Sequence, residues 1–169
     1  MLYLKYFFVY SILGYLFEGS VSYLRRGKFE SGILFGPWTP IYGIGVIFVL
    51  ILSNFLFSSM NLFWWLEVII VFLTLMLVMT FIEWLAGLLI EYFFGVIFWN
   101  YTSFKYNFGK YIALEVSLVW GLLSMLIIYV IHPFLSDYIR LIPSSFFYIL
   151  VILLILDYIL IIKNGKVHK

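Results

Sequence analysis

One stretch decides the fold class of this chain: LFWWLEVIIVFLTLMLVMTFIEWLAGLLIEYFF, from Leu62 to about Phe94. It is apolar almost throughout. At about 1.5 Å per residue, a helix of this length exceeds the roughly 30 Å of the hydrocarbon core unless it tilts strongly or bends near Gly87. We therefore expect one long membrane-spanning helix that reaches the interface.

Four other segments approach the roughly 20 apolar residues that a spanning helix needs. They cover residues 2–24, 41–57, 111–131 and 143–162. The segments are continuously apolar, whereas strands of a membrane barrel would alternate in runs of about ten residues, so a barrel is excluded. The sequence predicts an all-α, polytopic bundle of about five membrane-spanning helices that form a single integral membrane domain over residues 1–169.

The composition agrees with this fold class. Of the 169 residues, 66% are hydrophobic, 23% are aromatic and 11% are charged, whereas soluble domains have roughly 45–50% apolar and about 25% charged residues. The chain has no cysteine, which excludes disulfides, thiolate metal sites and a cysteine nucleophile. The net charge is +2 and no basic face is present, so we expect no nucleic-acid partner.

The basic residues predict the orientation. Five crossings put the loop at 25–31, the loop at 95–110 and the C-terminal tail on one side of the membrane. That side carries all but two of the ten Lys and Arg residues; the exceptions are Lys5 and Arg140. The positive-inside rule makes the basic side cytoplasmic and predicts an N-out, C-in topology. The basic residues of this side are Arg25, Arg26, Lys28, Lys105, Lys110, Lys163, Lys166 and Lys169.

An irregular segment precedes the second span. Residues 32–38 are apolar but are interrupted by Gly36 and Pro37, so they cannot continue a helix. In lipid their backbone groups would lack partners, and we expect a re-entrant or interfacial loop packed on protein. We expect the next helix to start at Pro40, because the preceding threonine can cap it. Proline also has no N–H group that the first turn of a helix would leave unpaired.

Two interpretations of this segment stay open. One is a tight interfacial turn anchored by Trp38. The other is a gate or pocket floor, for which the candidate residues are Gly36, Pro37, Trp38, Pro40 and Tyr42.

Several acidic residues lie inside the predicted helices: Glu18, Glu83, Glu91, Glu115 and Asp157. A charge at mid-membrane costs about 2.5–3.5 kcal/mol on insertion scales, so these side chains are expected to face the bundle. Glu83, Gly87 and Glu91 recur every four residues and share one stripe of the long helix. The geometry permits Glu18, Glu83, Glu91 and Glu115 to converge from three helices, and these four are our candidates for a substrate or ion site.

Such a cluster can coordinate a cation, relay protons or hold a cationic group of a substrate, because neighbouring carboxylates attract positive charge. The alternative is that the carboxylates pair with basic residues and tie loops to helix ends. The basic residues available for this pairing are Arg25, Arg26, Lys28, Lys105 and Lys110. No metal-ligand motif and no cofactor site is predicted.

The loop that follows the long helix alternates aromatic and small polar residues from Trp99 to Lys110. Trp and Tyr favour the headgroup region, so interfacial anchoring is expected, with a binding surface as the alternative. Anchoring does not explain the two asparagines. The candidate loop residues are Trp99, Asn100, Tyr101 and Asn107.

The fourth segment carries small residues at helical spacing, which predicts a close-packing face, with a ligand site as the alternative. These residues are Ala113, Ser117, Gly121 and Ser124. His132 and Pro133 are expected to close this helix on the outer side. A metal or haem role for His132 would need partners that the sequence does not show.

Motifs in the first four segments resemble a known family. They are GYLFE (14–18), FGPWTPIYG (35–43), EWLAGLLIE (83–91), WNYT (99–102), NFGK (107–110) and SLVWG (117–121). Their order and spacing, over roughly Phe7 to Pro133, resemble the family of small bacterial membrane proteins named putative ABC-transporter type IV. The family commonly has an aspartate where this chain has Asn100, so the resemblance assigns no acid to that position.

The resemblance implies a permease or substrate-binding subunit of a transporter, multi-pass in the bacterial cytoplasmic membrane, with unknown substrate. The Gly-Lys pairs lack the surroundings of a phosphate loop, so no ATPase is expected in this chain. A separate ATPase would then dock on the cytoplasmic face, with residues 25–40 and 95–110 as candidates, and a second copy of the chain would help to enclose a pathway.

The alternative is a structural or regulatory membrane protein that assembles with a partner and transports nothing itself. A membrane enzyme acting on lipids is a third hypothesis. It is disfavoured because the sequence shows no recognisable catalytic constellation.

Overall fold

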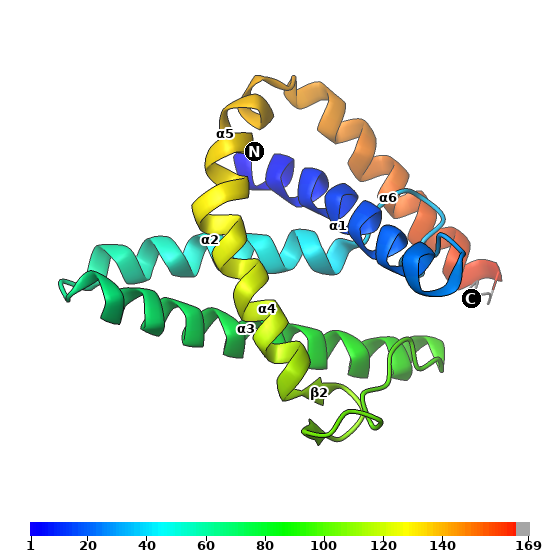
Figure 1. The fold of residues 1–169 in the computed structure, drawn as a ribbon. Helices are drawn as coiled ribbons and strands as arrows, with labels where there is room; N and C mark the ends of the chain where they lie inside the picture. Colours follow the sequence, from blue (N-terminus) through cyan, green and yellow to red (C-terminus); the bar gives the residue numbers. More distant parts are fainter. Residues whose placement is uncertain (165–169) are drawn as a thin grey trace. The chain divides into compact units, whose positions relative to one another are not determined.

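The computed structural model describes residues 1–164, and these are mainly helical (Figure 1). The helices are α1 (Leu2–Arg26), α2 (Pro40–Ser59), α3 (Trp64–Phe94), α4 (Leu114–Leu126), α5 (His132–Leu141) and α6 (Ser144–Asn164), and a π-helical turn, η1 (Ile127–Ile131), joins α4 to α5. A short antiparallel hairpin is formed by β1 (Asn107–Phe108) and β2 (Ile112–Ala113). Lys166, His168 and Lys169 of the predicted tail lie outside the described residues.

Five helical segments in the described part of the chain are long and apolar enough to cross a membrane. They are Leu2–Arg26, Pro40–Ser59, Trp64–Phe94, Leu114–Leu141 and Ser144–Lys163. This confirms the predicted all-α bundle of about five spans. The long third segment is one helix, as predicted, and the chain leaves it at Gly95, whose φ of 67° is a left-handed conformation that glycine adopts readily. The N-out, C-in orientation stays a prediction.

The predicted end of the fourth span is wrong. The sequence analysis closed this helix at His132 and Pro133, but the chain stays helical from Leu114 to Leu141. The π-helical turn η1 lies directly before the proline, and the N–H of His132 donates to the carbonyl of Ile127 instead of forming an α-helical bond. A local π adjustment accommodates the ring and missing N–H of proline, so the helix passes through Pro133 without ending.

The chain divides into two compact units. Unit 1 contains Met1–Ile44 together with the chain from Ser136 onwards, and unit 2 contains Gly45–Leu135. Each unit has its own buried side chains, described below. The assignment of the whole chain to a single membrane domain stays a prediction.

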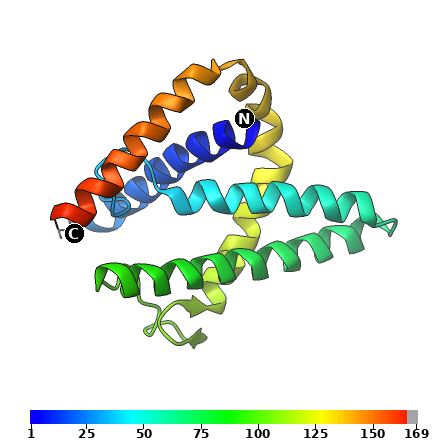
Figure 2. The same cartoon turned by 180° about the vertical axis from the view of Figure 1, so that it is seen from behind.

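In unit 1, α1 lies beside α6 (Figures 1 and 2). Phe8 and Phe147 are fully buried between these helices, with ring centroids 6.3 Å apart. The Nζ of Lys5 donates to the carbonyl oxygens of Arg140 at 3.0 Å and Ile142 at 2.6 Å, where α5 ends. A cation at the C-terminus of a helix satisfies orphan carbonyls and interacts favourably with the helix dipole. These contacts join the start of α1 to the end of α5.

In unit 2, α2 and α3 lie side by side around a core of Val49, Val71, Leu75 and Met79 (Figure 2). Helix α4 packs across α3 through the small residues that the sequence analysis singled out. A side chain at Gly121 would collide with the ring of Phe72, so glycine is required for this approach. The prediction of a close-packing face is confirmed.

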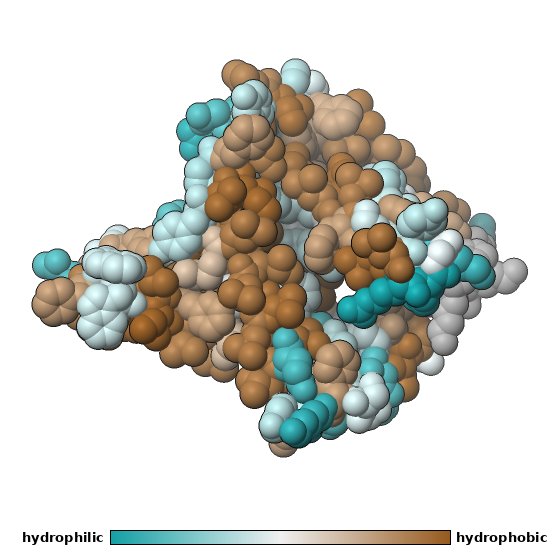
Figure 3. Space-filling view, viewed as in Figure 1, coloured by the Kyte–Doolittle hydropathy of each residue, from teal (hydrophilic) through white to brown (hydrophobic). Residues whose placement is uncertain are grey.

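The long helices expose mainly apolar side chains. In the space-filling view the surface over α4 is predominantly hydrophobic, whereas hydrophilic residues gather near the loops (Figure 3). An apolar outer face is what the hydrocarbon core of a bilayer requires.

Candidate functional site

The loop between α1 and α2 contains the irregular Gly–Pro segment and is held by Asp157 of α6. The Asp157 carboxylate, 5% exposed, accepts hydrogen bonds from the backbone N–H of Phe35 at 3.0 Å and of Gly36 at 2.8 Å. It also accepts from the Trp38 indole Nε1 at 2.9 Å. The carboxylate thus satisfies backbone N–H groups that irregular chain cannot pair with itself. The loop is packed on protein, as predicted.

Glu18 of α1 holds the same loop at an earlier point. The Ser31 hydroxyl donates to Glu18 Oε2 at 3.0 Å, and a second hydrogen bond of 3.0 Å joins Ser31 Oγ to Thr39 Oγ1. Because a hydroxyl has one proton, the Thr39 hydroxyl donates the second bond. Thr39 also donates its backbone N–H to the carbonyl of Ser11 at 3.0 Å. This chain of polar groups ties the residue before α2 to α1.

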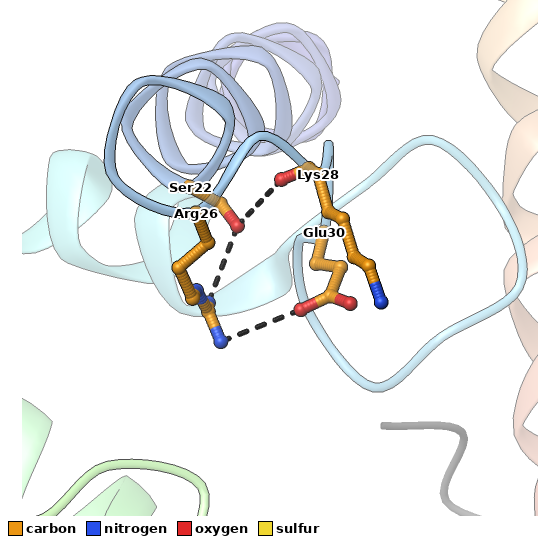
Figure 4. A network of polar contacts seen from close by, with 4 residues as sticks. All are labelled: Ser22, Arg26, Lys28 and Glu30. Atoms are coloured by element: carbon orange, nitrogen blue, oxygen red, sulfur yellow. Dashed lines mark hydrogen bonds and ion pairs between the residues drawn. The ribbon is translucent and has the colours of Figure 1, made fainter.

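The first residues of the loop are fixed by a small polar network (Figure 4). Ser22 Oγ donates to the carbonyl of Lys28 at 2.9 Å and accepts from Arg26 at 3.2 Å. The guanidinium of Arg26 forms an ion pair with Glu30 at 3.4 Å. Arg26 therefore forms its ion pair with a glutamate of the loop.

The remaining candidates of this loop take part in packing. Trp38 is buried, with its ring edge-on to Phe8 at 6.5 Å, so it anchors the turn from inside. A side chain at Gly36 would collide with the Trp38 ring. Pro37 lies between them, Pro40 begins α2 as predicted, and the ring of Tyr42 occupies the space left by Gly14. The gate or pocket floor stays a prediction.

In unit 2, Glu83 lies in the membrane-spanning part of α3 and is 5% exposed. The Tyr101 hydroxyl donates to its Oε1 at 2.6 Å, and the Trp120 indole Nε1 donates to its Oε2 at 2.8 Å. One donor comes from the loop after α3 and the other from α4. Glu83 therefore joins both to α3 through neutral donors.

Glu91 lies two turns further along α3, and its carboxylate accepts hydrogen bonds from residues 110 and 111 of the same loop. Its Oε1 is 2.6 Å from Lys110 Nζ, and the Tyr111 hydroxyl donates to its Oε2 at 2.7 Å. Burial, together with the hydrogen bond to the Glu91 carboxylate, raises the pKa of Tyr111 from its ordinary 10.0 to about 12. A side chain at Gly87 would lie 2.7 Å from the Tyr111 ring, so glycine allows this ring to approach α3.

The asparagines of the loop order its backbone. Asn107 Nδ2 donates to the carbonyls of Thr102 at 3.0 Å and Phe104 at 2.7 Å. Asn100 Oδ1 accepts from the backbone N–H of Thr102 at 3.0 Å. These bonds explain both asparagines, which interfacial anchoring leaves unexplained.

Two candidates in unit 2 keep unused hydrogen-bonding capacity. Glu115 Oε1 accepts from the backbone N–H of Tyr106 at 3.2 Å, but its Oε2 is buried and has no partner within residues 1–164. The same holds for Trp99 Nε1, whose ring is edge-on to Tyr111 at 6.1 Å. These two polar atoms differ from those of Glu83 and Glu91, which the protein already satisfies.

The structure thus places Glu83, Glu91 and Glu115 in one unit and Glu18 in the other. Convergence of all four carboxylates stays a prediction. Among the described residues, no group of three or more His, Cys, Asp or Glu side chains is arranged to hold a metal ion. Glu91 pairs with Lys110, one of the basic residues of the alternative interpretation, whereas Glu18 and Glu83 accept hydrogen bonds from neutral donors.

The sequence analysis missed the pairing of Asp157 with the loop amides and the roles of Tyr111 and Ser31. It also did not connect Trp120 with Glu83, whose carboxylate accepts a hydrogen bond from the Trp120 indole. Asp157 is separated from Phe35 by 122 positions, so spacing along one helix could not reveal the pair. The available signal was an intramembrane acid together with an apolar irregular loop, each of which requires a partner.

Comparison with known proteins identifies a family. The family model described as "Putative ABC-transporter type IV" matches residues 5–162, almost the whole chain. No curated protein and no solved structure matches the chain.

Proposed function

We propose that this chain, which belongs to the "Putative ABC-transporter type IV" family, is the permease or substrate-binding membrane subunit of a transporter. The family match over residues 5–162 is the observation that carries this proposal. Five helical segments able to span a membrane supply the transmembrane part, and the cell membrane is the proposed location. The substrate is unassigned.

The energy source in this proposal is a separate ATPase. The chain itself hydrolyses no nucleotide in this proposal, because its sequence has no phosphate loop. The ATPase docks on the cytoplasmic face, where the positive-inside rule puts the loops 25–40 and 95–110. A second copy of the chain, or another membrane subunit, completes the pathway.

Purification from the native membrane tests this proposal. The tagged protein is extracted in mild detergent and its partners are identified by mass spectrometry, with an unrelated tagged membrane protein of similar size as the control. Stoichiometric recovery of a nucleotide-binding ATPase is the expected result. Recovery of the chain alone, as a defined oligomer without ATPase, contradicts the ABC assignment.

The substrate-contacting groups of this proposal are Glu115 and Trp99. Both keep a buried polar atom without a partner in the described part of the chain, and such atoms are available to a ligand at little cost in existing hydrogen bonds. Glu115→Gln is expected to abolish substrate-stimulated ATPase activity of the purified complex while leaving accumulation in the membrane unchanged. Glu30→Gln, in the exposed loop of unit 1, is the matched control. Unchanged stimulation in Glu115→Gln removes Glu115 from the site.

A second candidate function is a structural or regulatory membrane subunit without transport of its own. It is favoured by the hydrogen bonds of Glu18, Glu83, Glu91 and Asp157, which all accept from donors of this chain. Glu83→Gln and Glu91→Gln distinguish the two functions. A transport site requires loss of activity at normal accumulation in the membrane, whereas a structural role requires that accumulation or complex assembly falls as well.

A further inference from the structure

The segment between α3 and α4 presents aromatic side chains outward. In the loop tip, which we define as residues 104–108, leading into and including β1, Tyr106 is 57% exposed and Phe108 is 80% exposed, and Phe104 is also exposed. Lys105 places its Nζ over the ring of Tyr106, 5.2 Å from the centroid. The hairpin of β1 and β2 lies beside the first turn of α4, and its strand β2 contacts α3 (Figures 1 and 2). Large exposed aromatic groups of this kind mark a contact surface.

Several backbone groups of this segment have hydrogen-bond partners within the protein. The N–H of Tyr101 donates to the carbonyl of Lys110 at 2.8 Å, that of Phe104 to Tyr101 at 2.9 Å, and that of Leu114 to Tyr106 at 3.0 Å. The carbonyls of Thr102 and Phe104 accept from the Asn107 side chain, and the N–H of Tyr106 donates to Glu115. Internal partners of this kind allow the segment to enter a less hydrated layer without leaving these groups unpaired.

The position of this segment between two membrane-spanning helices and its positive charge also indicate that it lies at the membrane surface. The segment joins the end of one membrane-spanning helix, at Phe94, to the start of another, at Leu114, so it lies at a membrane surface. Between these residues it contains Lys105 and Lys110 and no acidic residue. Tyrosine and tryptophan favour the headgroup region, and lysine is attracted to anionic lipid.

We propose that the loop tip inserts into the headgroup layer of the bilayer, with Tyr106 and Phe108 in contact with lipid and Lys105 beside the lipid phosphates. The occupant of this surface is the lipid of the membrane in which the protein resides, and not a water-soluble partner. The inference is independent of the transporter assignment. If both hold, the loop at 25–31 is left as the docking place for an ATPase.

Site-directed spin labelling tests the insertion. The chain has no cysteine, so Phe108→Cys gives a single label without any other change. The labelled protein is placed in vesicles of phosphatidylcholine and phosphatidylglycerol, and collisions of the nitroxide with oxygen, which concentrates in lipid, are compared with collisions with a water-soluble nickel chelate. Leu77→Cys in the middle of α3, where the native side chain is 64% exposed, supplies the lipid reference, and Lys28→Cys supplies the water reference.

The expected oxygen-to-chelate collision ratio at position 108 is several-fold above that at position 28, on the lipid side of the midpoint between the two references. A ratio on the water side overturns the proposal and leaves the tip available to a soluble partner. Tyr106→Cys is measured in parallel, because its backbone N–H and not its ring bonds Glu115, so the test survives if Phe108→Cys fails to fold. Vesicles without phosphatidylglycerol separate insertion from charge attraction: an inserted tip keeps a lipid-side ratio there.

Discussion

The loops after α1 and after α3 are both fixed to membrane-spanning helices, but through different contacts. Each carries irregular chain beside membrane-spanning helices, and each is held by carboxylates of those helices. The loop of unit 1 offers mainly backbone N–H groups to Asp157, whereas the loop of unit 2 builds its own hairpin and offers side-chain donors to Glu83 and Glu91. In the first loop the carboxylate replaces missing secondary structure; in the second it positions a structure that already exists.

This difference predicts that the loop of unit 1 depends more on its carboxylate. Asp157→Ala removes the acceptor that the N–H groups of Phe35 and Gly36 and the Trp38 indole share. Each buried donor left unsatisfied costs about 1–3 kcal/mol, so we expect the largest loss of stability of the substitutions considered, several kcal/mol in total. The midpoint of thermal denaturation in detergent measures it.

The matched control is Asp137→Ala in α5, also in unit 1. The Asp137 side chain is 84% exposed and lies 3.8 Å from Arg140, a surface pair of small energetic value. If Asp157→Ala and Asp137→Ala lower the midpoint equally, the carboxylate does not hold the loop and the comparison between the loops fails.

Glu83→Ala is expected to have a smaller effect than Asp157→Ala. It removes the Glu83 carboxylate as acceptor for two donors, the Tyr101 hydroxyl and the Trp120 indole, and the hairpin keeps its own hydrogen bonds. At about 1–3 kcal/mol for each buried donor, the loss should be measurable by thermal denaturation, with limited proteolysis reporting the loop. Glu83→Gln retains one acceptor oxygen and should lie between the alanine variant and the native protein. Rapid cleavage throughout residues 95–113 in Glu83→Ala would show that the hairpin does not stay folded without the contacts of Glu83.

Gly87→Ala tests how closely the second loop approaches α3. The added Cβ would lie 2.7 and 2.8 Å from ring carbons of Tyr111, and overpacking of this kind costs about 1–3 kcal/mol. Gly45→Ala, in the same unit, is the control because its Cβ would meet the flexible end of Met79. We expect Gly87→Ala to lower the denaturation midpoint more than Gly45→Ala. The reverse order would mean that the Tyr111 ring moves aside at low cost.

The spans, the start of α2 at Pro40 and the packing face of α4 could be predicted, because they depend on local composition and spacing. Apolar length fixes a membrane-spanning helix, and a stripe containing Ser117 and Gly121 marks where another helix approaches. The passage of the helix through Pro133 could not be predicted from proline alone, since it depends on the π-helical turn before it.

The candidate site was predicted less completely. The stripe of Glu83 and Glu91 follows from helical periodicity, but the donors come from Tyr101, Tyr111 and Trp120, which lie on other elements. Two acids within an apolar helix can be recognised in a sequence as needing partners, yet tertiary structure decides which of the many nearby Tyr, Trp and backbone donors bind them. The same limit hid the contact between Asp157 and Phe35.

The smallest expected effect is a pH dependence of the stability that the second loop contributes. The second loop is held partly by the Tyr111 hydroxyl, whose pKa is raised from its ordinary 10.0 to about 12 by burial and by the Glu91 carboxylate. A raised pKa means that the protonated phenol is favoured in the folded state, so its contribution is complete below pH 10 and is lost as the pH approaches 12. Tyr111→Phe lacks this hydrogen bond at every pH. The difference in denaturation midpoint between the native protein and Tyr111→Phe should therefore be constant up to about pH 10 and shrink above it, a comparison in which the other tyrosines and Lys110 cancel. A difference that stays constant to pH 12 would mean that the ring of Tyr111, packed against Gly87, and not its hydroxyl, fixes the second loop to α3.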